Sequence, residues 1–337
     1  MKTRILLSFI LLLITGFISG QIIHVPGDYP TIQDGINAAT DGDTVLVAED
    51  TYYENIRFMG KAITLGSEYI LDGDTNHINN TIIDGSQPSN PDSAAVVMFI
   101  HGEDTTSILN GFTITGGTGI LNMTWQFRGG GGIYTSDAGA KIVNNRIMNN
   151  TVEYMINAGG AGLQFLFGSG DRWAVVENNT ISHNHSIAHD YSAFGAGIWS
   201  SINIIIRNNT IEHNTCTNSN QITDGGGIEI ESVAGLFEAM GIIENNIIRY
   251  NECFGNTEAN GAGLMSLSSP CILRNNVFTY NSAIAADGLA TGGGFFINYV
   301  DSGVLVQNNI VKHNTLDGNT CWAGGARIRL CGWAESD

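Results

Sequence analysis

Two carboxylates, Glu229 and Glu231, and one indole, Trp199, are the residues of this chain whose types and spacing best suit chemistry. Glu229 and Glu231 are two positions apart in a short apolar stretch, so on a β-strand both would point to the same face. Two such carboxylates can act as a general acid and base or bind Ca²⁺. No catalytic motif surrounds either residue, so these roles are hypotheses that rest on placement alone.

The same residues belong to a column that recurs along the chain, one place after the first apolar residue of each glycine-rich start. The column reads Tyr134, Gln164, Trp199, Glu229, Met265 and Phe296. Aromatic faces with carboxylates and amides between them suit sugar rings, which present apolar faces and hydroxyl edges. We predict a carbohydrate-binding face centred on Trp199, Glu229 and Glu231, with Tyr134, Gln164 and Phe296 as further contacts. The alternative is a solvated face whose aromatic residues pack under loops.

The densest group of potential metal ligands is His183, His185, His189 and Asp190. Imidazole and carboxylate groups are common metal ligands. The repeat offers another explanation for His183, because it lies in a column of mostly planar side chains just before a recurring Asn. That column reads Asn149, His183, His213, Tyr250, Tyr280 and His313. We expect these rings to stack near a turn; no metal is assigned, and Ca²⁺ is the one cofactor considered.

A recurring Asn-Asn pair sets the spacing of all these residues. The six copies are Asn144-Asn145, Asn178-Asn179, Asn208-Asn209, Asn245-Asn246, Asn275-Asn276 and Asn308-Asn309. They begin 30 to 37 residues apart, and Asn110-Gly111 lies 34 residues before the first copy. A repeat of this size is typical of a fold that stacks similar coils, so residues can be compared from one rung to the next.

Each repeat contains three short apolar stretches that are rich in Ile and Val. One follows the glycine-rich start, one ends in the Asn pair, and one closes on a further Asn, as in Thr210-Ile211-Glu212-His213-Asn214. They are too short for helices and alternate like strands. Three strands in a turn of about 30 residues predict an all-β parallel β-helix, with a variable polar loop before the next start.

The Asn pair itself is predicted to be structural. Asn and Gly tolerate the left-handed backbone region, and Gly111 stands second in the earliest copy, so we expect a left-handed turn at the second place. The first Asn of each pair should stack on its neighbours, about 4.8 Å away, through side-chain hydrogen bonds.

Period-two alternation around the pair assigns further columns to the core and to the surface. The core columns are Ile142, Val176, Ile206, Ile243, Leu273 and Val306, and Ile147, Ile181, Ile211, Ile248, Phe278 and Val311. The column before the pair should form a charge ladder, with Glu177, Arg207, Glu244 and Arg274 alternating in sign. An aliphatic stripe should face outward beneath a covering segment or a partner, and it comprises Val175, Ile205, Ile242, Ile272 and Leu305.

The cysteines gain partners from the same register. Cys216 and Cys253 each follow a closing Asn by two residues, so stacking should bring them within bridging distance, and we predict a disulfide between them. Cys321 and Cys331 could form a second bridge. Cys271 falls on an inward column and is expected to be a buried thiol.

Composition and the chain start limit the partners. The 337 residues include 14 Lys and Arg against 32 Asp and Glu, a formal net charge of −18, which argues against nucleic acid or an anionic membrane surface. Residues 1–20 resemble a secretory signal, with a basic start and an apolar stretch too short to span a membrane. We expect a cap over residues 21–43 that contains a helix, then a β-helix over residues 44–337 whose last coil is truncated or uncapped.

The chain resembles the pectin-lyase-like superfamily of right-handed parallel β-helix proteins over residues 22–330. Tyr29-Pro30-Thr31-Ile32-Gln33, Gly42-Asp43-Thr44-Val45 and Thr51-Tyr52-Tyr53-Glu54 are similar to the start of many secreted members, and the Asn pairs resemble the asparagine ladder of pectate lyases. The resemblance implies three sheets, about 30–34 residues per coil, and a substrate groove on the first sheet.

The catalytic motifs of that superfamily are missing or broken. Gln164 stands where the matching pectin methylesterase stretch has its Asp, and the polygalacturonase motifs are absent. The repeat is also similar to that of polymorphic outer-membrane adhesins, as in Gly160-Ala161-Gly162-Leu163. We therefore predict a secreted or cell-surface β-helix that engages extracellular polysaccharide, with a polysaccharide lyase or glycoside hydrolase activity undecided. The alternative is a non-catalytic structural or adhesin module.

Overall fold

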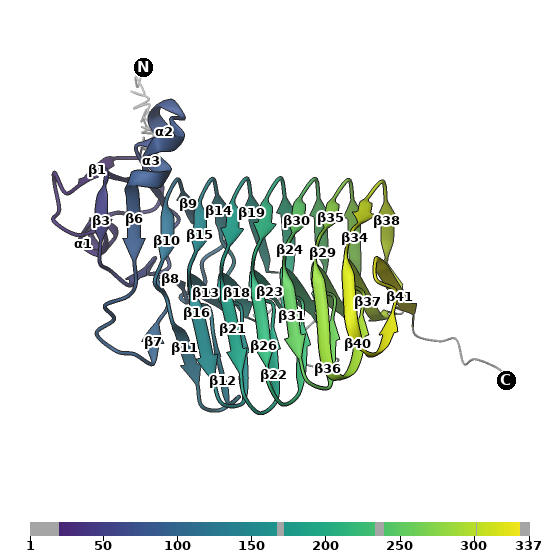
Figure 1. The fold of residues 1–337 in the computed structure, drawn as a ribbon. Helices are drawn as coiled ribbons and strands as arrows, with labels where there is room; N and C mark the ends of the chain where they lie inside the picture. Colours follow the sequence, from purple (N-terminus) through teal and green to yellow (C-terminus); the bar gives the residue numbers. More distant parts are fainter. Residues whose placement is uncertain (1–19, 167–171, 233–238, 301, 331–337) are drawn as a thin grey trace, which may run out of the picture.

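The computed structural model describes residues 20–166, 172–232, 239–300 and 302–330. The chain forms a solenoid whose coils stack side by side from one end to the other (Figure 1). Three sheets of parallel strands run along the whole solenoid, which confirms the predicted all-β parallel β-helix. The expected signal segment, apart from Gly20, lies outside the described residues.

After the first strand of sheet A, each coil contributes one strand to each of these three sheets, because its short aliphatic stretches pair in register with those of the next coil. Sheet A, in spatial order, contains β1 (Ile22–Val25), β2 (Thr44–Val47), β5 (Thr64–Ser67), β9 (Ile108–Asn110), β14 (Lys141–Val143), β19 (Trp173–Glu177), β24 (Asn203–Arg207), β29 (Gly241–Glu244), β34 (Cys271–Arg274) and β38 (Leu305–Gln307). Sheet B contains β3 (Asp50–Tyr52), β6 (Thr81–Asp84), β10 (Thr113–Thr115), β15 (Arg146–Met148), β20 (Thr180–Ser182), β25 (Thr210–Glu212), β30 (Ile247–Arg249), β35 (Val277–Thr279) and β39 (Ile310–Lys312). Sheet C contains β4 (Ile56–Arg57), β8 (Val97–Phe99), β13 (Ile133–Ser136), β18 (Leu163–Leu166), β23 (Ile198–Ser200), β28 (Ile228–Glu231), β33 (Leu264–Leu267), β37 (Phe295–Val300) and β41 (Ala326–Leu330).

A fourth sheet, sheet D, occupies the segments that we expected to be variable polar loops, so that expectation is wrong. The chain leaves sheet B in an outgoing layer and comes back to sheet C in a returning layer, and we call this two-layered extension the flange (Figure 1). The outgoing layer contains β16 (Thr151–Tyr154), β21 (His185–Ala188), β26 (Thr215–Asn218) and β31 (Glu252–Gly255). The returning layer contains β12 (Phe127–Gly129), β17 (Asn157–Gly159), β22 (Ser192–Phe194), β27 (Ile222–Asp224) and β32 (Glu258–Asn260).

The flange is completed at both ends by strands of other kinds. The long strand β36 (Ser282–Thr291) pairs with β31 and with β32, so it spans both layers, and β40 (Thr315–Trp322) follows it. At the other end, β11 (Gly119–Asn122) pairs antiparallel with β12 and with β7 (Ser93–Ala94).

The solenoid and the flange have separate cores of different composition. The solenoid core is built from large side chains, and the predicted core columns are buried in it except at the last coil, where Val306 is exposed and Val311 is half-buried. The flange core consists mainly of Ala side chains with Cys216 and Cys253. Small side chains let the two layers lie close together, which is why this segment carries no long aliphatic run in the sequence.

Both places of the Asn pair are structural, but their roles are the reverse of the prediction. The first Asn of each pair has a left-handed backbone, with φ between 54° and 59°. The second Asn is buried in every pair but the last, and it hydrogen-bonds along the stack: Asn145 N donates to Asn179 Oδ1 at 2.9 Å, and Asn179 Nδ2 donates to Ile142 O at 2.9 Å. The alignment explains the error, because Asn110 pairs with Val143, which places Gly111 opposite the first Asn of the pair.

A second ladder runs along the closing Asn of each repeat. Asn184 Nδ2 donates to Asn214 Oδ1 at 2.9 Å, and Asn214 Nδ2 donates to Asn251 Oδ1 at 3.0 Å. The residue before each closing Asn also has a positive φ. Its rings stack as predicted, with centroids 5.1 Å apart for His183 and His213 and 5.0 Å for His213 and Tyr250.

The outward columns of sheet A agree in part with expectation. The charge ladder is confirmed by ion pairs of Arg207 with Glu177 at 3.0 Å and of Arg274 with Glu244. The aliphatic stripe is in register, but all of its members are half-buried apart from Leu305, which is exposed. The stripe is therefore less open than alternation alone predicts.

The predicted disulfide is wrong, although its register is right. Cys216 and Cys253 are Cα partners in β26 and β31, and both are free thiols. In-register parallel strands hold their Cβ vectors side by side at about 4.8 Å, whereas a disulfide needs Cβ atoms that converge to about 3.8 Å. Cys253 Sγ instead accepts a hydrogen bond from Gly226 N at 3.1 Å. Cys271 is buried and free as expected, Cys321 is free, and Cys331 lies outside the described residues.

The N-terminal end is covered by α1 (Ile32–Ala38), which packs Ile32 and Ile36 against the first coil. Thr31 caps the helix by accepting from Asp34 N at 3.1 Å, and Glu54 accepts from the amides of Ile32 and Gln33. Two further short helices, α2 (Tyr69–Asp72) and α3 (Thr75–Asn80), follow β5. Among the described helices, none has the length and apolar character of a membrane span.

Candidate functional site

The site begins at a corner of glycines where the returning layer of the flange turns into sheet C. Gly195 and Gly225 have φ values of 51° and 56°, in the left-handed region. A Cβ on Gly195 would lie 2.6 Å from Trp199 Cβ, and one on Gly225 would lie 2.7 Å from Glu229 Cβ. Only glycine allows this close approach, which folds the flange back onto the neighbouring column of sheet C.

That column is the one predicted to bind carbohydrate. Its register is as expected, with Gln164 opposite Trp199 and Trp199 opposite Glu229. The exposure of the column differs from expectation, because the flange buries the whole column. Trp199 is 6% and Glu229 is 3% exposed, and Tyr134, Gln164 and Phe296 are also buried. The expectation of an open outward face is therefore corrected to a column at the base of an angle between two sheets.

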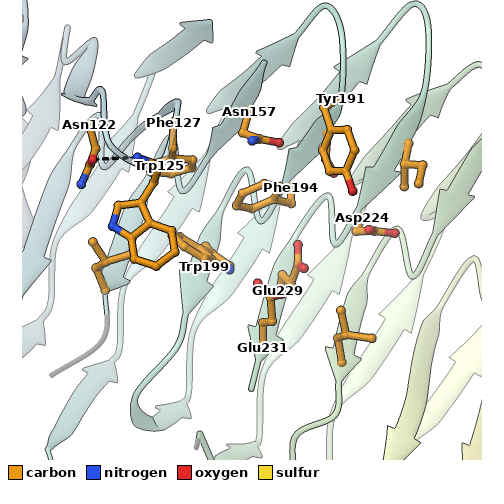
Figure 2. A pocket seen from close by; sticks show the side chains of 14 residues that line it. Asn122, Trp125, Phe127, Asn157, Tyr191, Phe194, Trp199, Asp224, Glu229 and Glu231 are labelled. Carbon is orange, nitrogen blue, oxygen red and sulfur yellow. Dashed lines mark hydrogen bonds between the residues drawn. The ribbon is translucent and has the colours of Figure 1, made fainter. Parts of the chain in front are cut away.

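A pocket of about 450 Å³ lies in the angle between the flange and sheet C (Figure 2). A cavity of this size suits a small ligand or a few units of a larger one. Its lining residues are Asn122, Trp125, Phe127, Asn157, Leu166, Tyr191, Ser192, Phe194, Trp199, Ile222, Asp224, Glu229, Glu231 and Leu267. Of the residues singled out in the sequence, the pocket contains Trp199, Glu229 and Glu231, while Tyr134, Gln164 and Phe296 lie outside its lining.

Aromatic side chains form one end of the pocket. The ring of Trp199 lies 5.2 Å from Phe127 and 5.0 Å from Phe194, in tilted and edge-on arrangements. Trp125 and Tyr191 stand at the rim, 51% and 61% exposed. Figure 2 shows Trp125, Phe127 and Trp199 toward one end, with Phe194 between Phe127 and Asp224.

Three carboxyl groups form the other end, from Asp224 on β27 and from Glu229 and Glu231 on β28 (Figure 2). Burial raises the pKa of Asp224 to about 7, and the negative charges of Glu258 and Glu231 add to the shift, while a 2.9 Å hydrogen bond from Asn260 Nδ2 opposes it. Burial also raises the pKa of Glu229 well above its ordinary value, with added repulsion from Asp224 and Glu231. Asp224 therefore titrates near neutral pH, beside two carboxyl groups whose pKa values are also raised.

Two polar atoms in the pocket have no hydrogen-bond partner among the described residues, Glu229 Oε2 and Trp199 Nε1. Burial raises the pKa of Glu231, and the Trp199 indole lies close enough to oppose that shift without forming a well-aligned hydrogen bond. Buried polar groups in native proteins are rarely left unpaired. Both atoms belong to side chains that line the cavity, so a ligand could supply the missing partners.

The chemistry available here is that of acids without a basic partner. A protonated Asp224 can donate a proton near neutral pH, and an ionised neighbour can accept one. Among the lining residues none is Lys, Arg or His, so the described pocket offers no basic side chain of the kind that pectate lyases use.

The candidate metal site is not assembled. His183 stacks on His213, and His189 Nε2 lies 2.9 Å from Glu153 Oε1. Burial lowers the pKa of His185, and the charge of His183 adds to this shift. Across the described ranges, no group of three or more His, Cys, Asp or Glu side chains, including one around Asp190, is arranged to hold a metal ion. The same finding gives the predicted Ca²⁺ role of Glu229 and Glu231 no support.

Sequence reasoning missed the flange half of the pocket: Phe127, Phe194 and Asp224, and the rim residues. A signal was present, because Phe194 and Asp224 each directly precede a corner glycine, Gly195 and Gly225. The repeat comparison that ordered the sheet C column would have ordered this column too. The small side chains of this segment, such as Ala158 and Ala193, hide its strand character in the sequence.

Comparison with known proteins supports the fold and adds no close relative. The family model described as "Right handed beta helix region" matches residues 69–331, well over half of the chain. No curated protein matches it significantly.

Proposed function

The chain belongs to the right-handed β-helix family, and from that premise we propose that it engages an extracellular polysaccharide through the pocket between flange and sheet C. One observation carries the proposal: a cavity of about 450 Å³ joins aromatic rings to one buried and two half-buried carboxyl groups. Aromatic rings pack against the apolar faces of sugars, and carboxyl groups accept hydrogen bonds from their hydroxyls.

The shape of this face favours binding over a purely structural module. A display module would need only a flat sheet C. Here the flange stands along one side of sheet C, and the corner glycines allow the two to lie close together. Exposed aromatic residues at the rim, Trp125 and Tyr191, extend the apolar surface toward solvent, where a chain could continue beyond the pocket.

The test is a binding screen against oligosaccharides that are neutral, N-acetylated, amine-bearing or uronic. We expect Trp199→Ala to weaken binding of the preferred class by about tenfold or more, since stacked aromatic residues dominate such sites. Tyr191→Ala should weaken it less and, being at an exposed position, should leave folding intact. Tyr53→Ala removes an equally exposed tyrosine outside the pocket and is the matched control.

A screen in which no class binds, or in which Tyr191→Ala and Tyr53→Ala behave alike, contradicts the proposal.

Export from the cell is part of the proposed function, because residues 1–20 have the pattern of a secretory signal. Mass determination of the N-terminus of protein recovered from the medium tests this, and an intact Met1 would argue against it.

Glycosidic bond cleavage is a second candidate function, favoured by the pKa of about 7 at Asp224 beside further carboxyl groups. Protonated Asp224 would donate its proton to the glycosidic oxygen as that bond breaks, and ionised Glu231 would accept a proton from the water that adds to the anomeric carbon. New reducing ends should then appear, and Asp224→Asn should lower their rate about 10²-fold. Binding without reducing ends would leave only the binding function.

A further inference from the structure

We propose that the carboxyl end of the pocket is a subsite for an ammonium group, so that the polysaccharide it takes carries free amino sugars. The inference rests on the proposed carbohydrate function and names its substrate class. It concerns the three carboxyl groups of Asp224, Glu229 and Glu231, together with the aromatic rings beside them.

Charge is the first support. Three carboxyl groups line the pocket, and no Lys, Arg or His is among its lining residues. Glu258 lies close enough to act on Asp224 by its charge, and it too is acidic. The whole chain carries a formal net charge of −18. A uronic acid would meet repulsion on entering this pocket, whereas an ammonium group would meet attraction.

The unpaired atom of Glu229 is the second support. Glu229 is 3% exposed, lines the cavity, and leaves Oε2 without a partner among the described residues. An ammonium group has three N–H donors and no acceptor, so it matches a set of acceptor-only carboxylates. Asp224 Oδ1 already accepts from Asn260 Nδ2, which leaves the rest of that carboxyl group for a ligand.

The aromatic wall is the third support. Trp199 and Phe194 pack edge-on against each other with centroids 5.0 Å apart, and both line the pocket beside the carboxyl groups. Aromatic faces attract cations, and desolvated sites strengthen the attraction. A sugar bearing an amine would use both features at once, with its ring on the aromatic wall and its charge at the carboxyl end.

A metal ion is a poorer fit to the same charges. A divalent ion needs several oxygen ligands within one short coordination shell, and the described residues contain no such group. An ammonium group makes separate hydrogen bonds over a wider span, so it does not require that convergence.

Proton linkage follows from the acids that face one another here. Asp224 faces Glu229 and Glu231 on β28, Glu258 on β32, and no basic group on these elements, and the Cys253 thiol of β31 also acts on Glu229. Without a bound cation, burial favours the protonated form of these acids. An ammonium ligand would favour their ionised form, so binding should release protons to the solution.

The experiment is isothermal titration calorimetry at about pH 5.5, where the sugar amines are ammonium groups and Asp224 is mostly protonated. The ligands are the tetrasaccharides of glucosamine, of N-acetylglucosamine and of glucose. Wild type should bind the glucosamine tetramer at least about tenfold more tightly than the other two. Titrations in buffers of different ionisation enthalpy should show proton release for glucosamine alone. The double variant Asp224→Asn, Glu231→Gln should lose the preference, and Glu252→Gln, an acid on the outgoing layer of the flange, should keep it.

The possible outcomes test the ammonium subsite separately from carbohydrate binding. Equal binding of the three tetramers, or tighter binding of the uncharged ones, overturns the ammonium subsite and leaves carbohydrate binding intact. No binding of any tetramer, or of the uronic acids in the wider screen, overturns both. Because the ligand comparison is made on wild type, the inference stays testable even if the double variant does not fold.

Discussion

Two edges of the same coil treat buried polar groups in opposite ways. We call the turns that carry the second Asn of each pair and the closing Asn of each repeat the Asn corners. At these corners, each buried amide is hydrogen-bonded to the coil before it and the coil after it, as Asn179 is to Asn145 and Asn209. At the glycine corner, Trp199 and Glu229 are equally buried, and Trp199 Nε1 and Glu229 Oε2 have no partner in the described chain.

The difference separates scaffold from site. A ladder repeated without interruption satisfies its own members, so it needs nothing from outside and contributes stability. A column whose residue types change at every rung, as sheet C does from Gln164 to Trp199 to Glu229, cannot pair with itself. Unpaired groups beside a cavity are then available to a ligand.

The largest predicted effect comes from breaking a ladder. Asn179→Ala removes the donor to Ile142 O and the acceptor for Asn145 N, which leaves buried backbone groups unpaired. We expect a loss of about 3 kcal/mol in the free energy of unfolding, measured by urea denaturation. Asn178→Gly, at the exposed neighbour that serves only the left-handed turn, should cost far less.

A substitution in the pocket provides the contrast to Asn179→Ala. Glu229→Gln changes an equally buried residue, but Glu229 Oε2 has no hydrogen bond to lose. The free energy of unfolding at pH 8 should therefore be unchanged or slightly higher. Similar losses for Asn179→Ala and Glu229→Gln would show that the two corners do not differ in kind.

Substitution at the glycine corner should cause the next largest loss of stability. Gly195→Ala imposes a φ of 51° on an L-residue and puts its Cβ 2.6 Å from Trp199 Cβ, so the flange must shift. We expect a loss of about 2 kcal/mol and weaker sugar binding. Gly73→Ala shares the positive φ without any atom within 4 Å, so it isolates backbone strain. Equal losses in the two variants would mean that close approach to sheet C is unimportant.

The pocket acids should invert the usual dependence of stability on pH. Since the pKa of Asp224 is raised to about 7 in the folded state from 3.8, its contribution is fully present below about pH 4 and is lost as pH rises through 7. Asp224→Asn should therefore stabilise the protein by roughly 1–2 kcal/mol at pH 8 and have little effect at pH 4. Urea denaturation of both proteins at the two pH values tests this; a variant that is less stable at pH 8 would contradict it.

The smallest effect belongs to the charge ladder on the outside of sheet A. Glu244→Arg replaces the ion pair with Arg274 by a like charge, yet Arg274 is exposed, so solvent screens the pair. We expect a fall in melting temperature that corresponds to less than about 1 kcal/mol and that shrinks in high salt. An unchanged melting temperature at low salt would mean that the ladder does nothing for stability.

Much of the solenoid could be predicted because its signals are local and repeated. Period-two alternation gave the core columns around Ile206 and Ile211, and the register of β24 and β29 follows from the Asn pairs. The exchange of roles within the pair was missed because two adjacent Asn residues are chemically identical, and only the true alignment of Gly111 distinguishes them.

The flange and its pocket were missed for a different reason. Its layers pack Ala158 and Ala193 where a strand pattern would normally show large aliphatic residues. The burial of Trp199 and Glu229 depends on that flange folding back, which is a contact between segments and not a property of either one. The sequence therefore indicated the correct column and the wrong environment for it.

The most direct test follows both corners in one two-dimensional ¹H–¹⁵N NMR titration with the preferred sugar. We predict that the indole N–H signal of Trp199, assigned with Trp199→Phe, shifts as the pocket fills, while the side-chain amide signals of Asn179 and Asn214 stay in place. Stationary Trp199 under saturating ligand, or ladder amides that shift as much as Trp199 does, would contradict the claim that the glycine corner is the site and the Asn corners are its scaffold.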